Sequence, residues 1–193
     1  MPLSPARRAL SAIAFAAIAS AAQAQPRPVV VASGLQHPWA VAFLPGRRFL
    51  VTERPGRLRV VEADGRLLPP VRGVPEVASG GQGGLLDVVT DAGFATNRTI
   101  YFCFSEEGPG GNGTALARAR LSPDLERLED VRVIFSQRPK VRSSAHFGCR
   151  IVERPDGTLL LTLGERFSRR DDAQKLDNHL GKIVRVGKDG SVP

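Results

Sequence analysis

Long apolar runs, histidine, cysteine and two of the aromatic residue types are scarce in this sequence. Its 193 residues include three histidines, two cysteines, one tryptophan and one tyrosine. The histidines lack metal-ligand spacing relative to the cysteines, which argues against a zinc site. The Gly-x-Ser-x-Gly signature of many hydrolases is absent. No Lys-Ser/Thr follows the glycine-rich stretch 80–84, so a Walker phosphate loop is excluded as well.

One uncharged apolar run does occur, at the N-terminus. Arg7 and Arg8 precede an Ala- and Ile-rich stretch over 9–22, and 22–24 reads Ala-Gln-Ala. This order is typical of a signal peptide, and the run is too short for a stable membrane span. We expect residues 1–24 to be removed after Ala24, leaving 25–193 in the periplasm or secreted. A buried N-terminal helix is the alternative, and no later segment approaches a membrane span.

The chain is basic, with a formal net charge of +8. A basic surface can attract nucleic acid or acidic lipid. Here the arginines are scattered among strand-like segments, and no Lys/Arg block has interleaved aromatics. The pattern indicates a solvated basic face and no nucleic-acid partner.

Cys103 and Cys149 each lie in an apolar run. Two buried free thiols are therefore the expected state. An exported protein meets an oxidising compartment, so a disulfide between them stays open as the alternative.

From residue 29 onward, short apolar runs alternate with Gly, Pro and Asp, and no long stripe of period 3.6 appears. Runs of this length, rich in β-branched and aromatic residues, predict antiparallel strands. The stretch 106–114 is predicted to be a flexible loop. The expected strands are 39–44, 48–52, 58–61, 85–89, 99–104, 115–121, 131–135, 151–152, 158–163 and 182–186.

Two of these stretches repeat. Residues 56–65 align without gaps to 181–190, and 43–54 resembles 153–166 in a strand, a Pro/Gly turn, a strand and Glu-Arg. A middle stretch over 87–128 has the same rhythm. Three such repeats predict an all-β chain that forms part of a β-propeller, with about three blades. Since propellers close with about four to eight blades, the chain is expected to be truncated. A complete small sandwich is the competing fold.

Two polar islands interrupt the apolar pattern. Gln82 stands among glycines at 80–84, and His146 lies in a Ser-Ser-Ala-His-Phe-Gly stretch before a strand. Histidine is the side chain best suited to take a proton near neutral pH. His37 and His179 are weaker candidates because both lie at turns into strands. The Asp-Asp pair at 171–172 is expected to be solvated.

Several motifs in order resemble the soluble quinoprotein glucose/sorbosone dehydrogenase family, especially its aldose sugar dehydrogenase branch. The resemblance covers residues 30–193. The motifs are Leu-Gln-His-Pro-Trp-Ala-Val-Ala-Phe-Leu-Pro at 35–45, Thr-Glu-Arg-Pro-Gly-Arg-Leu at 52–58, Gly-Gln-Gly-Gly-Leu-Leu-Asp at 81–87, Asp-Ala-Gly-Phe-Ala-Thr-Asn at 91–97, His-Phe-Gly-Cys-Arg at 146–150, His-Leu-Gly-Lys-Ile-Val-Arg at 179–185 and Asp-Gly-Ser-Val-Pro at 189–193.

This resemblance implies a six-bladed propeller that binds pyrroloquinoline quinone (PQQ) on calcium. It implies that His146 is the general base that takes the proton from the anomeric hydroxyl of an aldose, giving a lactone, and that Gln82 hydrogen-bonds the sugar. An external acceptor would then take the electrons. The residues that hold the quinone and the metal are expected mostly beyond Pro193, with no metal ligand here, so residues 25–193 alone are expected to be inactive.

Four positions depart from the family pattern. Ala145 stands where glucose-oxidising relatives carry an acid, Glu165 replaces an aspartate, and Cys149 replaces a frequent glycine. Arg170 aligns with a sugar-contacting amide, so that role is not transferred to it. Two other functions remain open: an exported propeller that only binds ligands or proteins, and a propeller hydrolase or lactonase, which needs a metal held by inward carboxylates.

Overall fold

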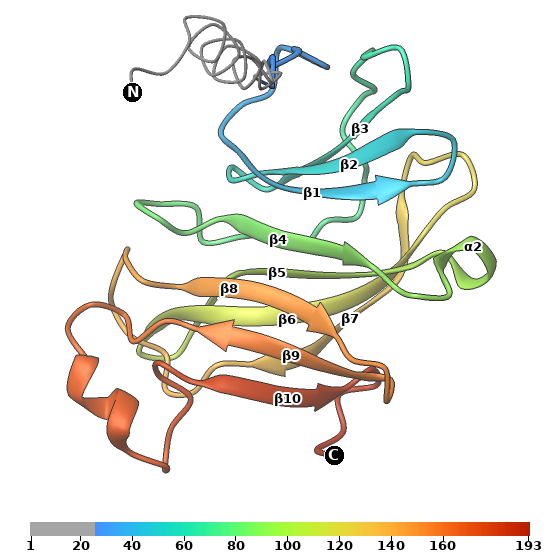
Figure 1. Cartoon of the computed structure of the whole chain (residues 1–193). Coiled ribbons are helices and arrows are strands. Elements are labelled where there is room, and N and C mark those ends of the chain that lie inside the picture. The colour runs from blue at the N-terminus through green and yellow to red at the C-terminus, as the bar shows by residue number, and fades with distance from the viewer. Residues whose placement is uncertain (1–25) are drawn as a thin grey trace, which may run out of the picture. The chain divides into compact units, whose positions relative to one another are not determined.

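The computed structural model describes residues 26–193, and the signal peptide predicted at 1–24 lies outside this range. The described chain is almost entirely β-structure, arranged in three antiparallel sheets (Figure 1). The first sheet has β1 (Pro38–Leu44), β2 (Arg48–Glu53) and β3 (Arg57–Val61). The central sheet has β4 (Leu85–Thr90), β5 (Thr99–Gly108), β6 (Gly111–Leu121) and β7 (Leu128–Ser136). The third has β8 (Gly148–Glu153), β9 (Thr158–Leu163) and β10 (Ile183–Gly187).

Two short helices complete the described elements. Helix α2 (Phe94–Asn97) follows β4, and a 3₁₀ helix (Arg170–Gln174) lies between β9 and β10. None of the described helices is long and apolar enough to cross a membrane.

The repeat seen in the sequence is a repeat of structure. Strands β1, β2 and β3 pair in chain order, and β8, β9 and β10 do the same. The turns β1–β2 and β8–β9 each contain a glycine at positive φ, Gly46 at 78° and Gly157 at 77°. Glycine reaches this conformation without the steric cost that a Cβ imposes. The turn residues therefore set both hairpins.

The prediction of a flexible loop at 106–114 is wrong. Strands β5 and β6 continue through most of this stretch and turn only around Pro109 and Gly110. A Cβ at Gly111 would lie 2.4 Å from the carbonyl carbon of Val141. The glycines therefore allow a close crossing of two chain segments rather than mobility.

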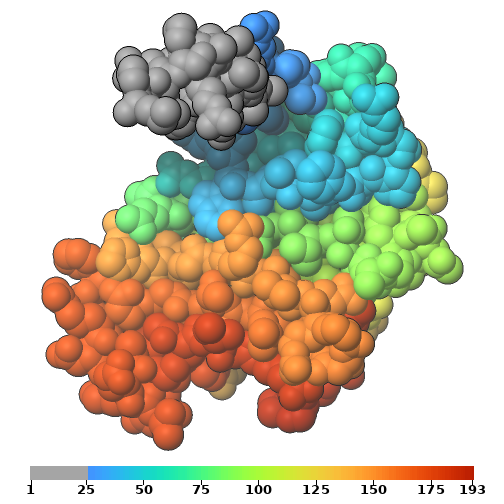
Figure 2. Space-filling view, in the orientation of Figure 1, coloured from blue at the N-terminus to red at the C-terminus, as the bar shows by residue number. Residues whose placement is uncertain are grey.

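The three sheets stack face to face in chain order. Strands β1 and β2 contact β4, and β4 and β5 contact β8. The space-filling view shows the same succession, from the blue first sheet through the green central sheet to the orange and red third sheet (Figure 2). This stacking of small sheets confirms the partial β-propeller, and the two-sheet sandwich is wrong.

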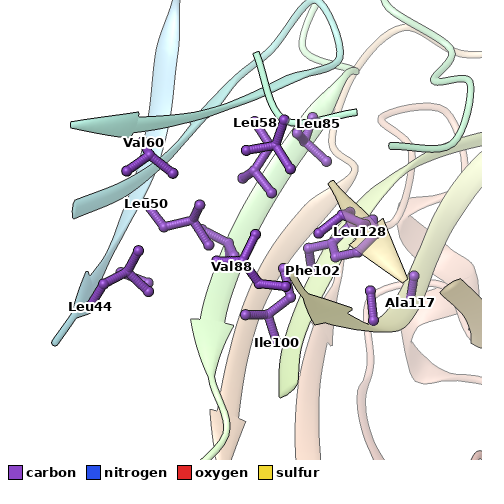
Figure 3. Close-up of a cluster of buried hydrophobic side chains, with 14 of the residues drawn as sticks. Leu44, Leu50, Leu58, Val60, Leu85, Val88, Ile100, Phe102, Ala117 and Leu128 are labelled. Atoms are coloured by element: carbon purple, nitrogen blue, oxygen red, sulfur yellow. The ribbon is translucent and has the colours of Figure 1, made fainter. Parts of the chain in front are cut away.

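An apolar cluster fills the space between the first and central sheets. Leu44, Leu50, Leu58 and Val60 meet Val88, Ile100 and Phe102, all of them buried (Figure 3). These side chains alternate along their strands, as expected for strands that bury one face. Burial at about 25 cal/mol per Å² makes this contact a main source of stability.

The second cluster, between the central and third sheets, is apolar at its centre and holds a disulfide. Cys103 on β5 is bonded to Cys149 on β8, with Cα atoms 6.7 Å apart. The expectation of two free thiols is therefore wrong. Each cysteine faces the same seam between sheets, so burial and pairing occur together.

Candidate active site

The two polar islands of the sequence lie against each other. The backbone N–H of Gln82 donates to the carbonyl of Ser144 at 2.8 Å, and the backbone N–H of His146 donates to Oε1 of Gln82 at 2.8 Å. Gln82 precedes β4 and His146 precedes β8, so both lie at the same end of neighbouring sheets. The fold therefore brings the two candidate residues together.

A carboxylate holds the imidazole of His146. Nδ1 of His146 lies 2.6 Å from Oε1 of Glu165, which follows β9. This hydrogen bond lowers the pKa of Glu165, so its side chain is a carboxylate at neutral pH. A carboxylate can only accept, which assigns the proton to Nδ1 and leaves the lone pair of a neutral imidazole on Nε2. The His146 side chain is 39% exposed.

A cleft opens at Gln82 and Gly148, next to the loop that carries His146. It has a volume of about 440 Å³ and is lined by His37, Pro38, Trp39, Arg54, Gln82 and Gly148. The side-chain oxygen of Gln82 is bonded to the His146 loop, and its exposed NH₂ group has no hydrogen-bond partner among the residues described. Gln82 can therefore donate to a molecule in the cleft.

A larger cleft, of about 720 Å³, lies at the opposite end of the central sheet. Its lining includes Arg98, Arg118, Arg120 and Arg132 but no histidine. The 440 Å³ cleft is the candidate active site because Gln82, which lines it, bonds the loop that carries His146.

Arg166 organises the loop that carries His146, and the sequence analysis missed it. Its guanidinium is buried and donates from Nε to the carbonyl of Ala145 at 2.9 Å and from Nη2 to the carbonyl of Ser143. Nη1 and Nη2 also bond the carbonyl and side-chain oxygens of Asn112, each at 2.8 Å. Burial lowers the pKa of Arg166 to about 10, so it stays charged at neutral pH.

The ring of His146 has an aromatic neighbour. The Phe167 ring meets it edge-on, with centroids 5.4 Å apart, and Phe167 is itself 58% exposed. Both residues have positive φ, His146 at 50° and Phe167 at 64°. This conformation is costly for bulky side chains and is held where the surroundings enforce it.

The buried carboxylate of Asp87 and its partner Arg150 link residues of all three sheets. Asp87 on β4 accepts from the N–H of Ile151 at 2.7 Å and from Arg150 on β8 at 2.8 Å. Arg150 in turn lies 5.4 Å from the ring centroid of Trp39 on β1. Burial raises the pKa of Asp87 despite these hydrogen bonds.

The remaining predicted residues have other surroundings. His179 accepts the N–H of Arg138 at its Nδ1 and lies against Phe135, and burial lowers its pKa. His37 lines the cleft, and Arg170 is exposed. The prediction of a solvated Asp-Asp pair is wrong for Asp172, which is buried and paired with Arg169 and Lys175.

No three His, Cys, Asp or Glu side chains within residues 26–193 gather closely enough to hold a metal ion.

Comparison with known proteins finds a matching family. The sequence profile of the family described as Glucose / Sorbosone dehydrogenase matches residues 35–193. The aldose sugar dehydrogenase YliI of Escherichia coli (strain K12) is 42% identical over 192 residues, covering 97% of this chain and 52% of the relative.

Two solved structures are similar in both fold and sequence. A crystal structure of glucose dehydrogenase superposes with a TM-score of 0.82 at 46% identity, covering 87% of this chain and 49% of the other. The PQQ-bound form of an aldose sugar dehydrogenase from Streptomyces coelicolor gives a TM-score of 0.73 at 30% identity, covering 84% and 48%. The chain spans about half the length of the proteins it matches.

Proposed function

Because the chain belongs to the glucose/sorbosone dehydrogenase family, we propose that the complete protein oxidises the anomeric hydroxyl of aldose sugars to lactones. The observation that carries this proposal is a chain of contacts from an open cleft to an imidazole: Gln82 lines the cleft and bonds the His146 N–H, and Glu165 bonds the His146 ring.

His146 is the proposed general base. Its Nε2 takes the proton of the anomeric hydroxyl as hydride leaves the same carbon. Glu165 supports this role in two ways: it fixes the tautomer through Nδ1–H, and its negative charge stabilises the imidazolium that forms. The aspartate of related motifs is one methylene shorter than Glu165, and the 2.6 Å contact supports the longer side chain in the same role.

Gln82 is the proposed sugar-binding amide. Its oxygen is occupied by the His146 N–H, so its NH₂ group is the part that can donate to a sugar hydroxyl. Because one side chain bonds both the His146 loop and the ligand, a bound hydroxyl would be placed close to the imidazole. The exposed aromatic ring of Phe167 adds an apolar surface beside the imidazole of His146.

PQQ and calcium are the proposed cofactors of the complete protein, as the PQQ-bound relative suggests. When bound, the quinone would accept the hydride, and an external acceptor would later take the electrons. The described residues fit the substrate side of such a site, since they supply the base and the amide. Within residues 26–193 no three His, Cys, Asp or Glu side chains cluster, and we assign none of these residues to calcium.

Export is part of the proposal and rests on the sequence. The positive start, the apolar stretch and the Ala-Gln-Ala site support cleavage after Ala24 and a periplasmic or secreted location.

The experiment uses the complete reading frame that contains this chain, reconstituted with PQQ and calcium. We expect aldose-dependent reduction of an artificial electron acceptor. His146→Ala should lower kcat/KM by about 100-fold or more, as expected for loss of a general base. His179→Asn is the matched control, because an asparagine oxygen can replace Nδ1 as the acceptor for Arg138, and it should keep its activity.

Two results would contradict the proposal separately. A loaded wild-type protein that binds aldoses without oxidising them would be a binding propeller, and the enzyme assignment would fail. Full activity in His146→Ala would leave the enzyme in place but remove the base assignment.

A further inference from the structure

In the loop that carries His146, every main-chain carbonyl from residue 143 to residue 147 accepts a hydrogen bond. Arg166 accounts for three of them: its side chain bonds those of Ser143 and Ala145, and its backbone N–H bonds that of His146 at 3.3 Å. The carbonyl of Ser144 accepts from Gln82. The carbonyl of Phe147 accepts from the Thr114 hydroxyl at 2.6 Å and from the Gly164 N–H at 3.1 Å.

The guanidinium of Arg166 is unusual in its partners. It is buried, yet each hydrogen bond that its guanidinium makes within the described residues goes to an uncharged oxygen. Its central carbon lies 3.6 Å from the ring centroid of Phe147, the residue after His146. A planar fork with five donors can bond three residues in two chain segments at once, which a lysine ammonium cannot do with the same geometry.

Three consecutive residues after β9 thus hold His146 in three ways. Glu165 bonds the ring, Arg166 bonds the loop on either side, and Phe167 packs against the ring edge. The positive φ of His146 needs such support, because an unrestrained loop would relax to a commoner backbone conformation and turn the imidazole.

We propose that Arg166 is a positioning residue, which holds the 143–147 loop so that the imidazole of His146 stays hydrogen-bonded to Glu165. This inference rests on the proposed function for its effect on turnover. The effect on the loop itself does not depend on that function. Arg166 touches neither substrate nor proton in this role.

The molecule contains a matched control, Arg98. Its φ is also positive, its guanidinium lies 5.7 Å from the Phe94 ring, and it donates to the carbonyls of Leu121 and Ser122 at 2.7 and 2.6 Å. It makes these contacts at the other end of the central sheet. Arg98→Lys therefore repeats the chemical change of Arg166→Lys away from His146.

The first measurement is amide hydrogen exchange in the complete protein without quinone. Arg166→Lys should speed exchange in the peptide spanning 143–149 by at least tenfold, and leave the 121–128 peptide unchanged. Arg98→Lys should do the reverse. Unchanged exchange at 143–149 in a folded Arg166→Lys protein would overturn the inference.

The second measurement is steady-state kinetics of the loaded protein, normalised to the folded fraction. Arg166→Lys should lower kcat about 100-fold with little change in KM, because the base is misplaced while the cleft remains. Arg98→Lys should keep kcat. A normal kcat in folded Arg166→Lys would overturn the positioning role even if the loop exchanges faster.

Failure of the proposed function is visible before any variant is made, as a wild-type protein that oxidises no aldose. The exchange result then decides the loop-holding role alone. Should Arg166→Lys not fold, Asn112→Ala removes one acceptor of the guanidinium and should raise exchange at 143–149 by a smaller factor. No change in that variant would overturn the inference.

Discussion

The first and third sheets are copies of one repeat and place the same Glu-Arg pair differently. Glu53 is the last residue of β2 and Arg54 follows it, whereas Glu165 and Arg166 both come after the end of β9. In both copies the arginine N–H bonds the carbonyl of a histidine, His37 in the first and His146 in the third.

The two glutamates differ in their partners. The side chain of Glu53 is fully buried and accepts from Arg57 at 2.6 Å, from Arg59 at 3.4 Å and from the N–H of Gln36. Burial would raise the pKa of Glu53, but these hydrogen bonds outweigh it and lower the pKa. Glu165 is partly exposed, and its side-chain partner is the imidazole of His146. The carboxylate of Glu53, bonded to two guanidinium groups, stabilises the fold. The carboxylate of Glu165, bonded to the His146 imidazole, can instead support proton transfer by that ring.

The seams beside these sheets differ too. The first sheet meets the central one through leucine, valine and phenylalanine. The third meets it through a disulfide, the Asp87–Arg150 pair, and Lys188, which bridges Asp91 and Glu153. Hydrogen bonds cross the first seam too, such as that from the Thr52 hydroxyl to the carbonyl of Leu86 at 2.6 Å, but the disulfide and these ion pairs lie in the second seam, beside the sheet that carries the candidate base.

The largest effect is expected from removing the disulfide. Cys103→Ala with Cys149→Ala should lower the free energy of unfolding by about 4 kcal/mol, because the bridge closes a loop of 46 residues. Chemical denaturation measures the loss. A reductant should bring the wild-type protein to the same midpoint and leave the variant unaffected. Equal stability of the variant and the oxidised wild type would remove the distinction between the seams.

Exchanging each glutamate for glutamine tests the comparison directly. Glu53→Gln should cost about 3 kcal/mol of unfolding free energy, since Arg57 and Arg59 lose a buried counter-charge. It should leave kcat of the folded protein unchanged. Glu165→Gln should change stability by less than about 1 kcal/mol and lower kcat of the complete protein about 100-fold. Similar behaviour of both variants, in denaturation and turnover, would contradict the division of roles.

A smaller loss is expected from the cation that bridges the second seam. Lys188→Met should lower the unfolding free energy by about 2 kcal/mol at neutral pH, because it leaves the carboxylates of Asp91 and Glu153 facing each other. Lys182→Met is the control in the same sheet, since Lys182 bonds only backbone carbonyls in the described chain. Denaturation curves of both variants give the comparison, and an equal loss in the two would refute it.

The smallest expected effect is on the unfolding free energy at acidic pH. Burial would raise the pKa of Asp91, but hydrogen bonds from Lys188, Asn97, Tyr101 and the Gly93 N–H outweigh it and lower the pKa well below its usual range. A lowered pKa contributes stability that is present above about pH 4 and lost as the pH falls further. The wild type should lose about 1 kcal/mol between about pH 4 and pH 2 in excess of Lys188→Met. Asp87 acts in the opposite direction, since its pKa is raised, but it is common to both proteins.

Much of the fold follows from local sequence. The Pro-Gly and Pro-Asp-Gly turns predict the β1–β2 and β8–β9 hairpins, and the repeat predicts that β3 and β10 continue them. The sequence does not predict that β5 and β6 extend into 106–114, because a glycine-rich stretch is typical of a flexible loop. In the structure, Gly111 instead allows the chain to pass close to Val141. Local composition does not distinguish the two uses.

The candidate site was predictable in part. Gln82 and His146 were named from their polar surroundings and the family motifs, and their contact stands in the structure. The Glu165 contact could have been derived, because an antiparallel hairpin places the residues before β8 beside those after β9. The Arg166 contacts and the disulfide could not, since each joins different sheets, and their geometry depends on how those sheets stack.

Tyr101, the single tyrosine, donates its hydroxyl hydrogen to Asp91 within the second seam. Burial and that carboxylate raise the pKa of Tyr101 far above its ordinary value. The near-ultraviolet band of tyrosinate should therefore stay absent through moderately alkaline solution and emerge only when this seam parts. One phenol thus provides an intrinsic optical reporter of a particular contact, without labelling or an added dye.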